Sequence, residues 1–517
     1  MTEARCTSST LLPVMNETLF NLALNRSAVE LGGAFVSAPA SLAARMPPKL
    51  QAAFRHFGHA VRNGRRAIVA AFGGSMLAGA KCSDGVPEHH WQPSCAFASR
   101  FASALSKDID FINLAVGGTP TAGILPSLHA LLQGVSTRAA QNEPVLLLLD
   151  YSGNDGQLGL NARSVLDLRA AVESLLRYIL SSWPSFAFLL VETYHSAPVD
   201  KWLRMAYADV AVHYGVPHLR YANVARNWRY AWYPNPACDK NGLAGKRDDA
   251  RRYGTGDCVH PPWQTHQLIA EVLIISYSSL ATALCEARAL DQAQLAAAAA
   301  AVLPAALSQR AQLERFAVCE QPLASYSAAS LLHAASTTPG VRITSGNWSL
   351  YEDRPGKPGW ITLGPANSTI EFDLRFGRAP RLVLSYMKGY SDDLGVVELR
   401  MHVPTRWRSR DPTRRYAQLF HWAKLDGRVP EDAPRVTQTY MLSMAVADTQ
   451  MQNYAMNTEF QRSNESGFSG VLGYGIEPHS EATARFTLSP SSCMDGSGSS
   501  PSTGTGCKFK IVSLTSC

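Results

Sequence analysis

A carboxylate and an imidazole lie three residues apart in the pentad Gly256–His260, which reads Gly-Asp-Cys-Val-His. At this spacing Asp257 can accept the Nδ1–H of His260, which fixes the tautomer of the ring and leaves Nε2 free to act as a base. A serine hydroxyl on a glycine turn is a natural partner for such a base. Ser75 follows two glycines far upstream, so the three side chains together predict nucleophilic catalysis by serine.

Four segments in a fixed order carry residue types that acyl transfer needs. In order and type they resemble the four blocks of the SGNH, or GDSL-type, hydrolases, in which a serine, a glycine, an asparagine and a histidine define the site. The resemblance covers residues 65–285, a little under half of the chain. The segments are Ala71–Gly79, Asn113–Thr119, Asp150–Gly156 and Gly254–Pro262.

The resemblance implies a role for each residue of the candidate triad. Ser75 would be the nucleophile, and His260 would be the general base and then the general acid. Asp257 would orient His260. Chemistry of this kind uses only protein side chains, so we expect no metal and no organic cofactor.

The resemblance also implies an oxyanion hole, made by the backbone N–H of Ser75, the backbone N–H of Gly118 and the side-chain amide of Asn154. Donors of this kind stabilise a tetrahedral intermediate and are each worth about 10²–10³ in rate. Glycine lets the backbone approach a substrate closely, and asparagine offers an uncharged NH₂ donor. Gly117 is the alternative to Gly118, because the sequence does not say which amide points inward.

The nucleophile segment departs from two common patterns. Gly74 stands where the resembling family usually has an aspartate. That aspartate is not the acid of the triad, so the departure is compatible with activity. Leu77 occupies the second position after the serine, so the segment lacks the Gly-x-Ser-x-Gly pattern of the α/β-hydrolase nucleophile elbow.

Apolar runs that are typical of buried parallel strands precede the serine, glycine and asparagine segments. Amphipathic stretches lie between the runs, and this alternation predicts a three-layer α/β/α domain with a parallel sheet. Sites in such sheets lie at the carboxyl ends of the strands, where all three segments fall. The expected strands are Ala67–Phe72, Asp110–Val116, Val145–Tyr151 and Phe186–Thr193, and the expected helices are Cys95–Ser106, Ser164–Trp183, Arg204–His213 and Gln264–Leu284.

The sequence pattern changes after this region. An alanine-rich stretch at 287–306 favours helix. From residue 341, short segments alternate apolar and polar residues between turn residues, which predicts a C-terminal antiparallel β-sandwich. We therefore expect an N-terminal leader with helical pieces (1–64), the hydrolase domain (65–286), a helical linker (287–340) and the sandwich domain (341–517).

Composition limits the class of protein. The 517 residues are 46% hydrophobic and 17% charged, with a formal net charge of +7, which is typical of a folded globular protein and excludes a disordered one. The densest basic cluster, Thr405–Arg415, also holds an aromatic residue and an acid, so it favours a solvated loop over a surface for an anionic partner. We expect no nucleic-acid partner and no transmembrane segment, and the oligomeric state stays open.

Ten scattered cysteines and five Asn-x-Ser/Thr sequons favour an oxidising, secretory compartment. Cys82 with Cys95, and Cys238 with Cys258, bracket loops beside the candidate serine and histidine, where disulfides would hold both halves of the site. Four buried thiols are the alternative. Because Met1–Thr10 does not resemble a signal peptide, we expect that the true start lies upstream; a cytosolic protein is the alternative.

These observations predict a serine esterase that hydrolyses carboxylic esters, with an ester or an acylated carbohydrate as substrate. An O-acetylated glycan fits the secretory features and a sandwich that could hold carbohydrate. Two alternatives remain at this point. One is a glycan O-acyltransferase, and the other is a non-catalytic glycan-binding protein that has kept the catalytic residue types.

Overall fold

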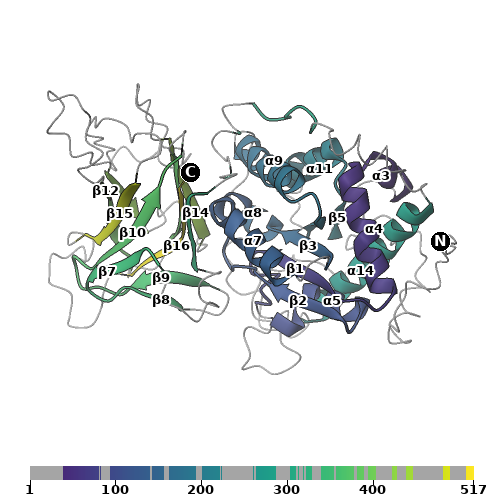
Figure 1. Cartoon of the computed structure of the whole chain (residues 1–517), viewed down its shortest axis with the longest axis horizontal. Helices are drawn as coiled ribbons and strands as arrows, with labels where there is room; N and C mark the ends of the chain where they lie inside the picture. Colours follow the sequence, from purple (N-terminus) through teal and green to yellow (C-terminus); the bar gives the residue numbers. More distant parts are fainter. Residues whose placement is uncertain are drawn as a thin grey trace, which may run out of the picture. The chain divides into compact units, whose positions relative to one another are not determined.

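The computed structural model describes residues 39–80, 82, 93–139, 143–156, 162, 164–193, 201–221, 223, 260, 263–286, 303–309, 313, 318, 322–328, 339–353, 357–377, 381–388, 394–402, 422–427, 438–445, 481–489 and 508–516. The chain forms two compact units (Figure 1). We call Met1–Thr121 with Val135–Leu313 the α/β unit, and Ala122–Gly134 with Glu314–Cys517 the sandwich unit.

A parallel sheet forms the centre of the α/β unit. Among the described residues its strand order is β2-β1-β3-β4-β5, and all four pairings are parallel. Strands β1, β3 and β4 are buried along their whole length, as strands covered by helices on both faces must be. The strands are β1 (Ala67–Gly73), β2 (Ile109–Asn113), β3 (Val145–Asp150), β4 (Ala187–Glu192) and β5 (His218–Arg220).

Helices cover the two faces of this sheet (Figure 1). Helix α4 packs against β1, β3 and β4, while α14 packs against α3, α4 and α5; η5 and α11 pack with α9. The helices of this unit are α3 (Pro39–Arg45), α4 (Pro48–Arg62), η3 (Pro93–Cys95), α5 (Phe97–Leu105), α8 (Ser152–Gly156), α9 (Ser164–Ser182), the π-helical η5 (Arg204–Ala208), α11 (Asp209–Tyr214) and α14 (Trp263–Glu286). Three more helices, α6 (Thr121–Ile124), η4 (Leu125–Ser127) and α7 (Leu128–Arg138), fall wholly or mostly within the segment 122–134 of the sandwich unit.

The structure confirms the predicted fold class, and all eight strands and helices expected between 65 and 286 are present. Three features go beyond the sequence analysis. Helix α4, which falls in the segment described above as a leader, buries Leu50, Phe54 and Phe57 at helical spacing. Asn154 lies on a short helix rather than in a turn. The short edge strand β5 was not expected, because His218 and Arg220 flank its one apolar residue.

Helix α14 is long and apolar enough to cross a membrane over Thr265–Leu284. However, 56% of the most apolar window is buried within the protein. Ile269, Leu273 and Leu280 are almost fully inaccessible, and the helix packs against α3, α4 and α5. These contacts are those of a core helix of the α/β unit.

The segment 303–309 includes the last four residues of the alanine-rich stretch, has no helical residue, and lies against α9 and α11. Glu173 on α9 is fully buried and accepts hydrogen bonds from the backbone N–H groups of Leu307 (2.7 Å) and Ser308 (2.8 Å) and from the hydroxyl of Tyr214 (2.6 Å). Burial alone would raise the pKa of Glu173, but these bonds outweigh it and lower the pKa. The remaining alanine-rich residues, 287–302, lie outside the described part of the chain.

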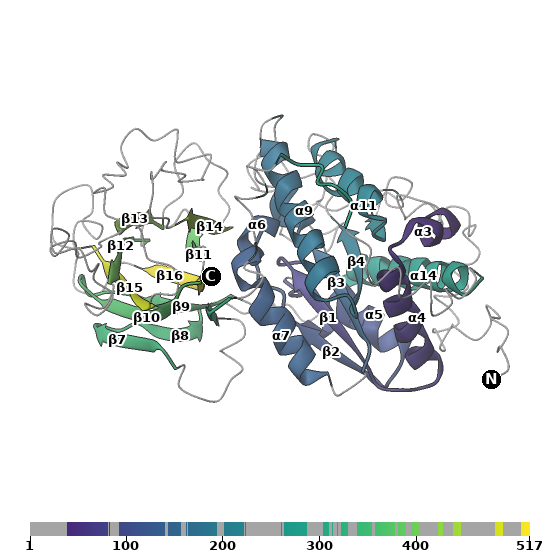
Figure 2. The same ribbon diagram turned by 45° about the horizontal axis from the view of Figure 1, so that its top comes forward.

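The sandwich unit contains two antiparallel sheets (Figure 2). Their inner faces share a core that includes Trp360, Phe372, Phe486 and Phe509, and β15 alternates buried and half-buried residues as a sandwich strand should. The first sheet orders β13 (Trp422–Asp426), β12 (Val396–His402), β15 (Glu481–Leu488), β10 (Thr369–Arg375) and β7 (Val341–Ser345); the second orders β14 (Gln438–Ala445), β11 (Arg381–Lys388), β16 (Phe509–Ser516), β9 (Pro358–Thr362) and β8 (Ser349–Glu352), with β6 (Ala324–Ser327) beside β16.

Candidate active site

Ser75 lies in a tight turn directly after β1. The turn is closed by hydrogen bonds from Ala78 N–H to the Gly74 carbonyl and from Ala80 N–H to the Ser75 carbonyl. The glycine at the end of β1 is sterically required, because a Cβ on Gly73 would lie 2.1 Å from the carbonyl oxygen of Asp150. The serine is therefore held at the carboxyl end of a central strand, as the sequence predicted.

The structure brings His260 to Ser75. The Nε2 atom of His260 lies 2.9 Å from Ser75 Oγ, which is hydrogen-bonding distance for a general base and its nucleophile. Both residues are half-buried, and helix α14 begins three residues after His260, at Trp263. Asp257, the expected orienting acid, lies outside the described residues.

Asn154 lies on α8, which follows β3, and its carboxamide bridges two other segments of the site. When the carboxamide oxygen faces the loop after β2, it accepts from the backbone N–H groups of Gly118 (3.2 Å) and Thr119 (2.8 Å). In this orientation both backbone N–H groups have an acceptor. In the reverse orientation the Asn154 NH₂ group would face the two N–H groups, and donors would face donors. Gly118 has φ +81°, which glycine adopts without strain.

The same carboxamide lies against the residue that precedes the nucleophile. A Cβ on Gly74 would meet the near terminal atom of the Asn154 carboxamide at 2.7 Å. Gly74 therefore allows Asn154 to lie beside Ser75. In this arrangement the Gly118 N–H orients Asn154, and the expected donation by Ser75, Gly118 and Asn154 to an oxyanion remains a prediction.

Asp150, which the sequence analysis did not single out, connects the ends of three strands. Its backbone carbonyl accepts from Gly74 N–H (3.0 Å). Its buried carboxylate accepts from the Ser152 hydroxyl (2.7 Å) and the Thr193 hydroxyl (2.5 Å). Burial raises the pKa of Asp150 to about 6, despite these hydrogen bonds. The position of Asp150 at a predicted strand end was the available sequence signal.

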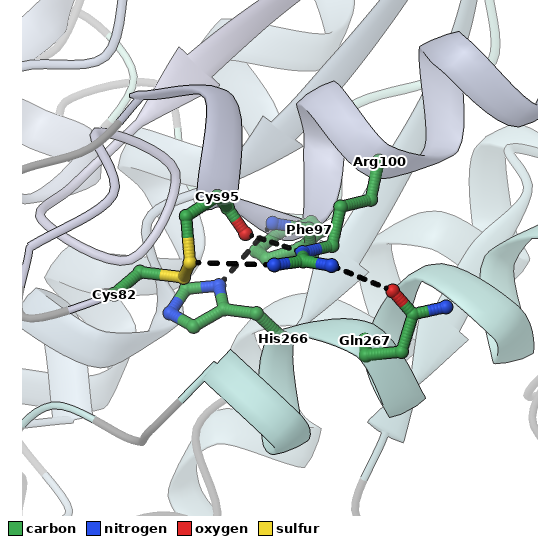
Figure 3. Close-up of a disulfide and its surroundings, with 6 residues drawn as sticks. All are labelled: Cys82, Cys95, Phe97, Arg100, His266 and Gln267. Carbon is green, nitrogen blue, oxygen red and sulfur yellow. Dashed lines mark hydrogen bonds between the residues drawn. A yellow bond between two sulfur atoms is a disulfide. The ribbon is translucent and has the colours of Figure 1, made fainter. Parts of the chain in front are cut away.

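A disulfide joins Cys82 to Cys95 (Figure 3), which confirms one of the two pairs that the sequence suggested. Cys82 follows the nucleophile turn, and Cys95 lies at the end of η3, two residues before α5 begins. Arg100 on α5 donates to the Cys95 carbonyl (2.8 Å) and to Gln267 Oε1 on α14 (2.9 Å). The disulfide and Arg100 thus link the nucleophile segment to the helix that follows His260. Cys238 and Cys258 lie outside the described residues.

His266 lies beside the disulfide and Arg100, and it is a different residue from the candidate base His260 (Figure 3). It is fully buried, stacks on Phe97, and its Nδ1 accepts from the backbone N–H of Phe97 at 3.2 Å (Figure 3). Burial, with a smaller contribution from the charge of Arg100, lowers the pKa of His266 to about 3. His266 is therefore neutral near pH 7 and serves to pack α14 against α5.

No protein-family model matches this chain, and a sequence comparison with curated proteins finds no match. Among solved structures, one similar fold is a two-domain esterase active on acetylated mannans, which is 16% identical over 87% of this chain and 91% of that chain, with a TM-score of 0.47. Another is an acetyl xylan esterase from Butyrivibrio proteoclasticus, which is 15% identical over 40% of this chain and 62% of that chain, with a TM-score of 0.27. At this level of similarity, the roles of the site residues rest on the geometry of this chain.

We predict that Gly74→Ala lowers the rate of ester hydrolysis without unfolding the protein. The new methyl group would push the Asn154 carboxamide away from Ser75, and misplacement by about 1 Å can cost about 100-fold in rate. Steady-state kinetics and thermal melting should be measured together. The matched control is Gly134→Ala on α7, where a Cβ meets nothing within 4 Å. Equal activity of both variants and the wild type would contradict the placement of Asn154.

We also predict that replacing the disulfide by two serines, Cys82→Ser with Cys95→Ser, lowers both stability and turnover. Loss of a bridge that closes a loop of this size costs about 3 kcal/mol, and the nucleophile segment loses its connection to α5. Melting temperature and turnover should be compared with and without dithiothreitol. The reductant should bring the wild type toward the double variant, and it should change the variant less, because the variant keeps only the other cysteines. Full activity of the variant would show that the bridge does not support the site.

Proposed function

We propose that this protein is a serine esterase that hydrolyses carboxylic esters through an acyl-enzyme. The observation that carries the proposal is the 2.9 Å contact between Ser75 Oγ and His260 Nε2. The Asn154 carboxamide beside Gly74 adds an uncharged donor group at the nucleophile. A nucleophile, a base and a neutral donor in this arrangement are the parts that acyl transfer requires.

In the proposed reaction, Ser75 Oγ attacks the acyl carbonyl carbon while His260 Nε2 takes the hydroxyl proton. The carbonyl oxygen becomes an oxyanion, which the Ser75 N–H and the Asn154 NH₂ would stabilise. The Gly118 N–H, expected from the sequence as a third donor, would act by orienting the Asn154 carboxamide. His260 then gives its proton to the departing alcohol, and an ester on Ser75 remains. Water, deprotonated by His260, attacks this ester and releases the carboxylic acid. Asp257 would hold His260 in the required tautomer throughout.

We propose acetylated carbohydrate as the substrate class, by fold-level analogy. A β-sandwich attached to a catalytic α/β domain could position a polymeric substrate, because remote binding contributes to orientation at the reacting group. Acetylated mannan and acetylated xylan are suitable first polymers, beside short aryl esters. Product analysis with and without added sugar acceptor separates hydrolysis from acyl transfer.

We propose that the protein matures in an oxidising, secretory compartment. The Cys82–Cys95 disulfide supports this location. Two of the sequon asparagines, Asn347 and Asn367, are exposed in the sandwich unit, where an N-linked glycan has access to solvent. The other sequons, at Asn16, Asn25 and Asn464, lie outside the described residues.

Ser75→Ala should abolish hydrolysis of aryl acetates while changing the free energy of unfolding by no more than about 1 kcal/mol, because Ser75 is half-buried in a turn outside the core. The matched control is Ser136→Ala, an exposed serine on α7, which should keep wild-type turnover. Both variants should be assayed for turnover and for chemical unfolding. Near-full turnover in Ser75→Ala would refute the nucleophile assignment.

A further inference from the structure

We propose that Asp155 is a positioning residue, which fixes the loop after β2 against α8 and so holds Asn154 and Gly118 in register beside Ser75. The inference rests on the proposed esterase function, because the effect expected on changing Asp155 is a loss of oxyanion stabilisation at that site. Asp155 itself does not touch the nucleophile or the base in the described hydrogen bonds.

The side chain of Asp155 is fully buried and accepts hydrogen bonds from two segments. Its Oδ1 accepts from the backbone N–H of Thr121 (2.9 Å), and its Oδ2 accepts from the Thr121 hydroxyl (2.6 Å). Oδ2 also accepts from the hydroxyl of Tyr207 on η5. The two hydroxyls lie 2.9 Å apart, so the carboxylate and both donors form a closed buried network.

Neighbouring residues on α8 thus bind neighbouring residues of one loop. The Asn154 oxygen accepts hydrogen bonds from the N–H groups of Gly118 and Thr119. The Asp155 carboxylate accepts hydrogen bonds from the N–H and the hydroxyl of Thr121. The loop between β2 and α6 is therefore attached to α8 at two successive points. If the outer attachment at Thr121 is loosened, the Gly118 backbone and the Asn154 carboxamide lose a fixed relation to Ser75.

Burial of the Asp155 carboxylate has an electrostatic cost. Burial, with a smaller contribution from Asp150, raises the pKa of Asp155 from 3.8 to about 6. The folded state then binds the proton more tightly than the unfolded state, so this group makes the unfolding free energy fall as the pH rises through that range. An ionised carboxylate is an acceptor at all of its lone pairs, whereas an asparagine must present an NH₂ group to one side. The charged form is the one that satisfies all three donors.

Glu173 provides a matched control in the same unit. It is also a fully buried carboxylate, and it likewise accepts from one tyrosine hydroxyl and from backbone N–H groups. Its partners, Tyr214, Leu307 and Ser308, hold the segment 303–309 and none of them is a site residue. The change Glu173→Gln therefore reports the general effect of losing a buried carboxylate, and Asp155→Asn adds the effect on the site.

The experiment compares the wild type, Asp155→Asn and Glu173→Gln in full-length protein. We measure kcat and KM with an aryl acetate, and the inhibition constant of a trifluoromethyl ketone, which adds to a serine as a tetrahedral oxyanion. For Asp155→Asn we expect kcat to fall about 10- to 100-fold with KM within about twofold, and ketone affinity to fall by a similar factor. Glu173→Gln should keep wild-type kcat and ketone affinity.

The inference is overturned if the wild type is active and Asp155→Asn matches Glu173→Gln in kcat and ketone affinity. If circular dichroism shows that Asp155→Asn does not fold, Thr121→Val decides by the same criteria, because it removes the hydroxyl donor and keeps the backbone N–H. A wild type without esterase activity would overturn the proposed function and this inference with it. An active wild type with an unaffected variant would overturn the inference alone.

Discussion

The hydrogen bond between Ser75 and His260 depends on two distant segments that must meet at one edge of the parallel sheet. Ser75 is placed by the end of β1, where Gly73 lets the chain pass the Asp150 carbonyl. His260 is placed by the start of α14, which the disulfide, Arg100 and His266 connect to the nucleophile side. A serine hydroxyl is a weak nucleophile without a base at this distance, so both placements are needed for the proposed chemistry.

Two buried carboxylates lie at the carboxyl ends of the strands, and each links its own strand to a neighbouring segment. Asp150 links β3 to the residues after β4, and Glu192 at the end of β4 binds Arg220 on β5 at 2.9 Å. Buried ions carry a desolvation cost that their partners offset only with good geometry. Asp150 uses its acceptors for a backbone N–H and two hydroxyl groups beside the nucleophile turn, which is consistent with a role in orientation rather than in stability.

Local patterns predicted the parts of the fold that depend on local composition. The apolar runs of β1, β3 and β4 and the helical spacing of α9 were visible because burial selects residue types directly. Strand β5 was missed since its His218 and Arg220 are buried against Glu192, and no local pattern reveals a partner on another strand. Likewise the sequence indicated Asn154 as a donor, but its contact with Gly74 and the attachment of Asp155 to Thr121 arise only when the segments pack together.

The central claim is that Ser75 is an activated nucleophile, and active-site labelling tests it most directly. A fluorophosphonate probe reacts with a serine whose hydroxyl is activated by a neighbouring base. The labelled protein is digested and the modified peptide identified by mass spectrometry. We predict a single adduct, on Ser75, that is lost when His260 is changed to alanine. Absence of labelling in folded wild-type protein, or an adduct on a different serine, would contradict the account.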